Sequence, residues 1–282
     1  MTQKAKKVLP KVFGSSRPLI GMIHFPPLIG LPEYPGFEYI KAKMLREVKI
    51  LEQGGVDAIM IENNYDLPHH EKVSSMTAAM MGSLAQIVSQ TSVLPVGISI
   101  LWNDYETALA ICASTRLSFF RVPAFVDTVK TGYGIMKARS TEVLALRKRL
   151  GLEDMAILAD IQVKHSEMVD KNKGLDVSAQ EAVDAGANVL IVTGKWTGDA
   201  PQVDDLKTVR SAVGEFPILI GSGATRENLP LLLTYTDGVI VGTDLKEGRN
   251  RDKKEEVNIK PYQANISPTR TVEFVKSFRN SL

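Results

Sequence analysis

The chain has 282 residues, of which 44% are hydrophobic, and its formal net charge is only +2. It is long enough to bury a sizeable core, and its charge gives no reason to expect a nucleic acid as partner. No apolar run reaches the ~20 residues of a membrane span, no secretory signal is recognisable, and the single Cys112 excludes an internal disulfide, so we expect a cytoplasmic protein without integral membrane association.

Segments rich in β-branched and apolar residues alternate along the chain with segments of helical periodicity. The first pair is an expected strand at 18–24 followed by an amphipathic helix at 37–53. Further strands are expected at 56–61, 94–101, 118–122, 155–163, 189–193, 216–220 and 238–241. Further helices are expected at 74–89, 104–114, 141–150, 178–185, 203–213 and 225–233, with a last helix that begins at Ser267-Pro268.

These eight strand–helix units, with no linker between them, indicate one domain over residues 17–282 after an N-terminal extension at 1–16. The strands are apolar almost throughout, which is typical of a parallel sheet covered on both faces. Two α/β architectures fit this order: a closed (β/α)8 TIM barrel and a doubly wound open sheet. An open sheet would place its phosphate-binding glycines after the first strand. The glycine turns here follow the last two strands, which favours the barrel.

Two apolar runs near the C-terminus end in glycine turns, the first in Gly221-Ser222-Gly223 and the second in Gly242-Thr243. Because glycine has no Cβ, the backbone N–H groups of such turns can approach an anion closely. The loops after strands 7 and 8 of a TIM barrel frequently form a phosphate site. We therefore expect Gly221, Ser222, Gly223, Gly242 and Thr243 to bind the phosphate of a small metabolite.

Polar residues stand at the carboxyl ends of the other expected strands, where the active site of a TIM barrel lies. The expected catalytic residues are His24, Glu62, Asp160 and Lys164. The expected substrate-binding residues are Asn63, Asn103, Arg121, Gln162, His165 and Thr193.

Strand alternation places Asp160, Gln162 and Lys164 on one face, directed into the barrel. The alternative is a structural ion pair between Asp160 and Lys164. Glu62 fits a general base, an acceptor for a ligand hydroxyl, a metal ligand, or a partner that orients a neighbouring cation. For His24, the two alternatives are a catalytic role and a packing role.

No HxH or HExxH spacing occurs, so no metal or cofactor is expected, although a Mg²⁺ ion held by Glu62, Asp66 or Asp160 stays open. A charged insertion at about 246–262 follows the last strand. It fits a solvated loop, and its position also fits a lid over a bound anion.

The ordered motifs of this chain resemble the BtpA/SgcQ family of barrel proteins, which is named for a photosystem I biogenesis factor. The motifs that carry the resemblance are residues 17–24 (RPLIGMIH), 54–57 (GGVD), Glu62-Asn63, Asn103-Asp104, Ala159-Asp160, Val163-Lys164-His165, 221–223 (GSG) and 239–242 (VIVG). The family is similar to the ribulose-phosphate-binding barrels, and this implies a phosphorylated, sugar-like ligand.

Three functional hypotheses follow. The first is an enzyme that acts on a small phosphorylated metabolite by acid/base chemistry, as a lyase, isomerase or transferase. The second is a non-catalytic assembly or biogenesis factor that retains a vestigial phosphate pocket. The third is a nucleosidase or phosphoribosyl-handling enzyme, in which Trp102 stacks on the base. Homo-oligomerisation stays open.

Overall fold

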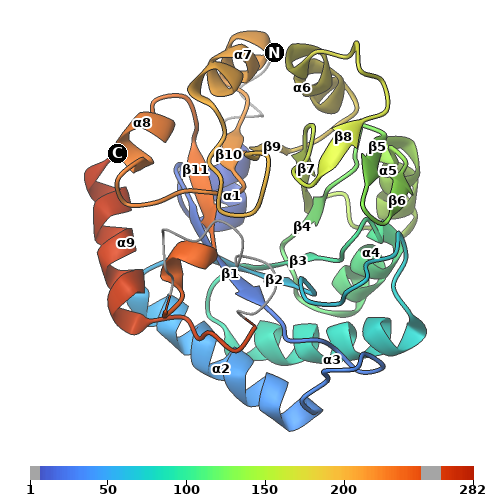
Figure 1. Cartoon of the computed structure of the whole chain (residues 1–282), viewed down its shortest axis with the longest axis vertical. Coiled ribbons are helices and arrows are strands. Elements are labelled where there is room, and N and C mark those ends of the chain that lie inside the picture. Colours follow the sequence, from blue (N-terminus) through green and yellow to red (C-terminus); the bar gives the residue numbers. More distant parts are fainter. Residues whose placement is uncertain (1–6, 249–261) are drawn as a thin grey trace.

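The computed structural model describes residues 7–248 and 262–282. Parallel strands close into a barrel in the order β1-β11-β10-β9-β7-β4-β3-β2, with helices around it (Figure 1). β1 pairs with both β2 and β11, so the expected TIM barrel is confirmed and the open sheet is excluded. The barrel strands are β1 (Leu19–His24), β2 (Ala58–Glu62), β3 (Val96–Ser99), β4 (Phe119–Val122), β7 (Ala156–Asp160), β9 (Val189–Val192), β10 (Ile218–Ile220) and β11 (Gly238–Val241).

The helices that follow the strands agree with the periodicity of the sequence, with one clear exception. The expected helix at 225–233 is reduced to the single turn Leu229–Leu232, and ahead of it the Asn228 side chain accepts a hydrogen bond from the Thr225 N–H at 2.8 Å. None of the helices in the described ranges is long and apolar enough to cross a membrane. The outer helices are α2 (Phe37–Gly54), α3 (Ser75–Thr91), α4 (Tyr105–Ser114), α5 (Ser140–Arg149), α6 (Leu175–Asp184), α7 (Val203–Val213), α8 (Leu229–Leu232) and α9 (Pro268–Asn280).

The segment before the first strand contains a short helix, α1 (Val8–Phe13), that closes the amino end of the barrel. Its Leu9 and Phe13 are buried against side chains that point into the barrel, and the Phe13 ring meets the Phe119 ring edge-on at a centroid distance of 5.0 Å. The barrel interior and α1 thus share one apolar cluster, while a larger cluster fills the space between strands and helices. Strand alternation explains the division, since Ile20 faces inward and Leu19 outward.

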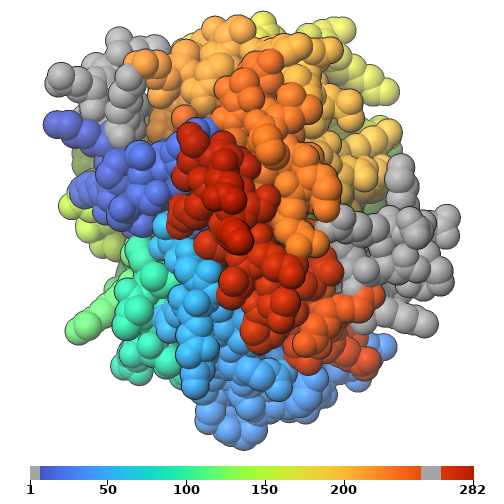
Figure 2. Space-filling model, turned by 90° about the vertical axis from the view of Figure 1, so that its left-hand side faces the viewer, coloured from blue at the N-terminus to red at the C-terminus, as the bar shows by residue number. Residues whose placement is uncertain are grey.

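The last helix, α9, completes the ring of outer helices by packing beside α2. Figure 2 shows α9 at the surface between α2 and the segment that carries α8. A Cβ on Gly54 would lie 2.4 Å from Cγ2 of Thr271, so the absence of a side chain lets α9 approach α2 closely. Residues 249–261 of the expected charged insertion lie outside the described residues, so the lid hypothesis stays a prediction.

A small antiparallel sheet lies beside the barrel, and the sequence did not lead us to expect it. Its strands β5 (Val129–Thr131), β6 (Gly134–Met136) and β8 (Ser166–Met168) pair in the order β6-β5-β8. β5 and β6 form a hairpin whose turn carries Tyr133. The sheet therefore joins the loop after β4 to the loop after β7, and both loops border the cavity described below.

Candidate active site

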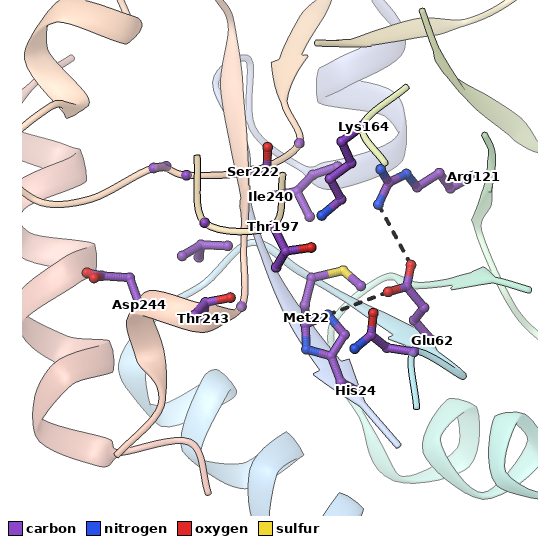
Figure 3. A pocket seen from close by; sticks show the side chains of 17 residues that line it. Met22, His24, Glu62, Arg121, Lys164, Thr197, Ser222, Ile240, Thr243 and Asp244 are labelled. Carbon is purple, nitrogen blue, oxygen red and sulfur yellow. Dashed lines mark ion pairs between the residues drawn. The ribbon is translucent and has the colours of Figure 1, made fainter. Parts of the chain in front are cut away.

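A polar cavity opens at the carboxyl ends of the barrel strands (Figure 3). The turns after β10 and β11 form one wall, and they include all five residues expected to bind phosphate: Gly221, Ser222, Gly223, Gly242 and Thr243. Opposite them, His24, Glu62, Arg121 and Lys164 direct their side chains into the cavity from four parts of the barrel. The structure therefore brings together residues that are far apart in the chain, as the strand-end rule predicts.

The turn after β10 lines the cavity with residues that carry backbone N–H groups. Those of Ser222, Gly223 and Ala224 make no hydrogen bond within the part of the chain that the structure describes. Gly223 has φ of 68°, a conformation that suits glycine, and a Cβ there would lie only 2.1 Å from the Ala200 nitrogen. Glycine at this position therefore permits both the turn and the close passage of the loop after β9.

Two hydroxyl groups hold the loops around the cavity. The Ser222 hydroxyl accepts a hydrogen bond from the Gly194 N–H at 3.0 Å and donates one to the Asp199 carbonyl at 2.9 Å. The Thr193 hydroxyl accepts from the Lys164 N–H at 2.9 Å. Both side chains therefore position loops, and the Ser222 turn faces the cavity with its backbone.

A buried ion pair orients one cation of the cavity. Nε and Nη2 of Arg121 donate to the two carboxylate oxygens of Asp160, each at 2.7 Å. Asp160 is fully buried and does not line the cavity. The third guanidinium nitrogen, Nη1, lies 3.7 Å from Oε2 of Glu62. Asp160 thus pairs with Arg121, and the alternative of a structural ion pair with Lys164 is wrong.

Lys164 brings a second cation to the cavity. Its Nζ makes no hydrogen bond or ion pair with any residue that the structure describes. Burial and the neighbouring Arg121 lower the pKa of Lys164 to about 8, against the opposing effect of Glu62 and Asp160. The ammonium group is therefore available to a ligand and titrates close to neutral pH.

His24 is a neutral partner of Glu62. Its Nε2 lies 3.6 Å from Oε1 of Glu62. Burial, reinforced by the positive charges of Lys246 and Lys164, lowers the pKa of His24 well below its ordinary value. The ring packs against Gly242, where a Cβ would lie 2.7 Å from its Cε1. Glu62 consequently stands between an uncharged imidazole and the Arg121 guanidinium.

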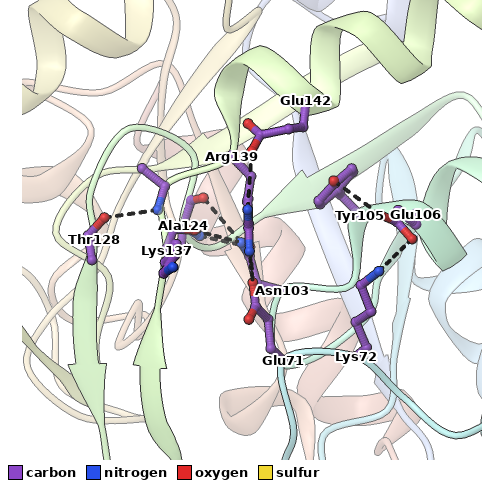
Figure 4. Close-up of polar contacts among 11 residues, drawn as sticks. Glu71, Lys72, Asn103, Tyr105, Glu106, Ala124, Thr128, Lys137, Arg139 and Glu142 are labelled. Carbon is purple, nitrogen blue, oxygen red and sulfur yellow. Dashed lines mark hydrogen bonds and ion pairs between the residues drawn. The ribbon is translucent and has the colours of Figure 1, made fainter.

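The two asparagines expected to bind substrate hold loops instead of lining the cavity. Oδ1 of Asn63 accepts from the Leu101 N–H at 2.7 Å. Oδ1 of Asn103 accepts from the Ala124 N–H at 3.0 Å, within the network of loop contacts in Figure 4. Both side chains are buried, and they tie the loops after β2, β3 and β4 to one another.

The expected shared face of Asp160, Gln162 and Lys164 is wrong for Gln162. β7 ends at Asp160, and Gln162 has φ of 43°, which interrupts the alternation of a strand. Its Nε2 donates to the Lys173 carbonyl and the Ser178 hydroxyl, away from the polar cavity.

A second compartment adjoins the polar cavity and shares Glu62, Asn64, Arg121, Lys164 and Thr197 with it. We call it the aromatic compartment. Among the expected residues it contains His165, and Trp102 lies there as well. Asn64 follows Glu62-Asn63 at a strand end, as the sequence indicates, whereas Thr197 and Trp196 were not expected from the sequence, although the strand-end rule applies to the loop that carries them. The residues that line this compartment and not the polar cavity are Leu67, His69, Leu101, Trp102, Pro123, Gly132, Tyr133, Val163, His165 and Trp196.

Within the described ranges 7–248 and 262–282, no group of three or more His, Cys, Asp or Glu side chains is arranged to hold a metal ion. Asp66 accepts from the Leu28 N–H at 2.9 Å, and Asp160 is engaged by Arg121. The Mg²⁺ ion considered from the sequence stays a prediction that nothing here tests.

The fold and the cavity define the class of this protein as a TIM barrel with a polar site at the carboxyl ends of its strands. Solved barrels are similar in fold. The alpha subunit of tryptophan synthase from Legionella pneumophila has a TM-score of 0.58 at 14% identity, and the match covers 99% of this chain and 100% of that one. N-(5'-phosphoribosyl)anthranilate isomerase from Pyrococcus furiosus has a TM-score of 0.55 at 13% identity, with 94% and 98% covered.

The chain belongs to the BtpA family, whose family model matches residues 15–263. It is 30% identical over 275 residues to the photosystem I biogenesis protein BtpA of Synechocystis sp., which covers 96% of this chain and 91% of that protein. It is also 34% identical over 235 residues to an uncharacterized protein of Pyrococcus horikoshii, with 83% and 89% covered. The resemblance seen in the sequence is therefore confirmed.

Proposed function

We propose that this protein is an enzyme that acts on a small phosphorylated metabolite by general acid/base chemistry. One observation carries the proposal: two glycine turns and four titratable side chains, His24, Glu62, Arg121 and Lys164, line a single cavity. The position of this cavity, at the carboxyl ends of the strands, is the one that barrel enzymes use.

The phosphate would lie at the turn after β10. Three backbone N–H groups, those of Ser222, Gly223 and Ala224, have no hydrogen-bond partner among the described residues and suit the oxygens of an anion. Two cations, Arg121 and Lys164, line the same cavity and favour a negatively charged ligand.

Glu62 and Lys164 are the candidates for proton transfer. A general acid or base works best when its pKa lies near the operating pH, and the pKa of Lys164 is lowered to about 8. Lys164 would donate a proton to the reacting part of the metabolite, and Glu62 would accept one. This exchange suits a lyase, an isomerase or a transferase. Neutral His24 would pack beside the Glu62 carboxylate, with its Nε2 3.6 Å from Oε1.

A second candidate is a non-catalytic role in assembly or biogenesis. The name of the Synechocystis relative, at 30% identity, favours it. In that case the cavity would be a vestige, and removing its charged groups would leave the biological role intact.

Ligand-induced thermal stabilisation tests the first candidate. A ligand at 100 times its dissociation constant stabilises the folded state by about 2.7 kcal/mol, which raises the melting temperature by roughly 5 °C for a chain of this size. We expect sugar phosphates to produce this shift and the unphosphorylated sugars to produce none. Lys164→Met should abolish the shift, and the exposed Lys11→Met, at the opposite end of the barrel, should retain it. Equal shifts with and without phosphate, or none with any sugar phosphate, would contradict the proposal.

A further inference from the structure

The aromatic compartment is much larger than the polar cavity to which it is joined. Its volume is about 320 Å³, and that of the polar cavity is about 40 Å³. Small-molecule sites generally have volumes of about 300–1,000 Å³. The polar cavity has room for little more than a phosphate group, and the aromatic compartment, which adjoins it at Lys164 and Thr197, has the volume to accept the remainder of a bound metabolite.

Large aromatic side chains reach this compartment from separate loops. Trp102 follows β3, Tyr133 lies in the β5–β6 turn, and Trp196 follows β9. Trp102 is nearly buried, but Tyr133 is 43% exposed and Trp196 is 52% exposed. Two of these aromatic side chains therefore leave much of their apolar area in water, and a flat apolar group placed against them would cover it.

The loop that carries Trp196 is fixed in place by His165. The Thr197 N–H donates to Nε2 of His165 at 3.2 Å, and the His165 N–H donates to the Lys195 carbonyl at 3.1 Å. The rings of His165 and Trp196 lie 5.4 Å apart. The position of Trp196 is thus held by hydrogen bonds on both sides of it, which suits a preorganised stacking surface.

The part of the compartment beyond the shared residues carries no formal charge at neutral pH. Its titratable side chains are Tyr133, His69 and His165. Burial lowers the pKa of His69 to about 4, and burial together with Lys164 lowers the pKa of His165 to about 4. Burial raises the pKa of Tyr133. An uncharged group suits these surroundings better than a second phosphate or a carboxylate.

We propose that the aromatic compartment binds an uncharged planar ring, so that the substrate of this protein is a phosphate ester that bears an aromatic or heterocyclic ring. This inference rests on the proposed function, since it places the phosphate of the same molecule at the turn after β10. The ring stacks between the aromatic side chains, and the segment between ring and phosphate passes Glu62 and Lys164.

Isothermal titration calorimetry with a small panel of phosphate esters tests this inference. The ring-bearing probes are AMP, UMP and 1-naphthyl phosphate, and the probes without a ring are ribose 5-phosphate and inorganic phosphate. We expect at least one ring-bearing ester to bind about tenfold more tightly than ribose 5-phosphate. Both tryptophans of the chain line the aromatic compartment, so the same ester should also change the tryptophan fluorescence.

Variants show where the ring binds. Trp196→Ala should remove the tenfold advantage and leave the affinity for ribose 5-phosphate within about twofold of the original. Tyr39→Ala is the matched control, because Tyr39 is 48% exposed on α2 and lies outside both compartments. The inference is overturned if all esters bind equally, or if the advantage survives in Trp196→Ala. If no phosphate ester binds at all, the proposed function fails as well, and this outcome differs from equal binding.

Discussion

Arg121 and Asp160 form an enclosed ion pair beneath the polar cavity. Both side chains are more than 90% buried, and two hydrogen bonds join them. Two charges withdrawn from water depend on one another, so loss of one leaves the other costly to bury. The pair also fixes the direction of the remaining guanidinium nitrogen toward Glu62. The arrangement of the cavity thus depends on a residue that does not line it.

Asp160→Asn should therefore destabilise the fold strongly. The expected loss is about 3–5 kcal/mol in the free energy of unfolding, because the guanidinium keeps its charge and loses its close carboxylate partner. Urea denaturation measures this loss. Asp154→Asn is the control, because Asp154 pairs with Lys11 at an exposed position and should cause no measurable change. Equal stabilities of the two variants would contradict the role assigned to Asp160.

At the scale of an element, α1 covers the amino end of the barrel. The inward-facing side chains of the barrel strands would meet water at the amino end if Leu9 and Phe13 did not cover them. The Phe13 ring lies against Phe119, which stands at the start of β4. A helix of six residues has little stability of its own, so its position depends on this packing.

Phe13→Ala should cost about 3–5 kcal/mol of stability, as expected for removal of a buried ring. Lys11→Ala changes an exposed side chain of the same helix, so it controls for effects on the helix itself. Thermal and chemical denaturation of both variants provide the comparison. A Phe13→Ala protein as stable as Lys11→Ala would show that α1 contributes little to the core.

The strands of the barrel could be predicted from the sequence, because apolar runs and glycine turns are local signals. The structure of the loops was harder to predict. Gln162 lies beyond the last residue of β7 and turns outward, and no local pattern indicated where that strand ends. Alternation around Val129 and the Gly-Tyr-Gly turn at 132–134 could have indicated the β5–β6 hairpin. The pairing of Asp160 with Arg121 joins two neighbouring strands at positions 39 residues apart in the chain, which periodicity does not show.

For the whole molecule, buried histidines link folding to pH. Burial lowers the pKa of His24, His69 and His165, the last two to about 4, so near pH 5 these side chains are neutral in the folded state and charged in the unfolded chain. The unfolded chain then binds about three more protons than the folded one, and the free energy of unfolding falls as the pH falls. Asp66 reduces this difference by about one proton, because burial raises its pKa to about 6 and the folded state therefore keeps its carboxyl group protonated near pH 5. The net difference near pH 5 is about two protons.

We therefore expect the free energy of unfolding to decrease by up to about 2.7 kcal/mol per pH unit as the pH falls through 5. Urea denaturation between pH 7 and pH 4.5 measures the slope. His69→Phe removes one titrating group, so the slope of stability against pH should fall by the contribution of about one proton. Stability that is constant or higher at pH 5 than at pH 7 would contradict this account of the buried histidines.

The central feature of the proposed function is a phosphate group held at the turn after β10. A crystal structure of the protein with ribose 5-phosphate tests this most directly. We expect the phosphate oxygens within about 2.7–3.2 Å of the backbone nitrogens of Ser222, Gly223 and Ala224, with Lys164 or Arg121 on the opposite side. A phosphate bound elsewhere on the barrel, or a polar cavity that stays empty at saturating ligand, would contradict it.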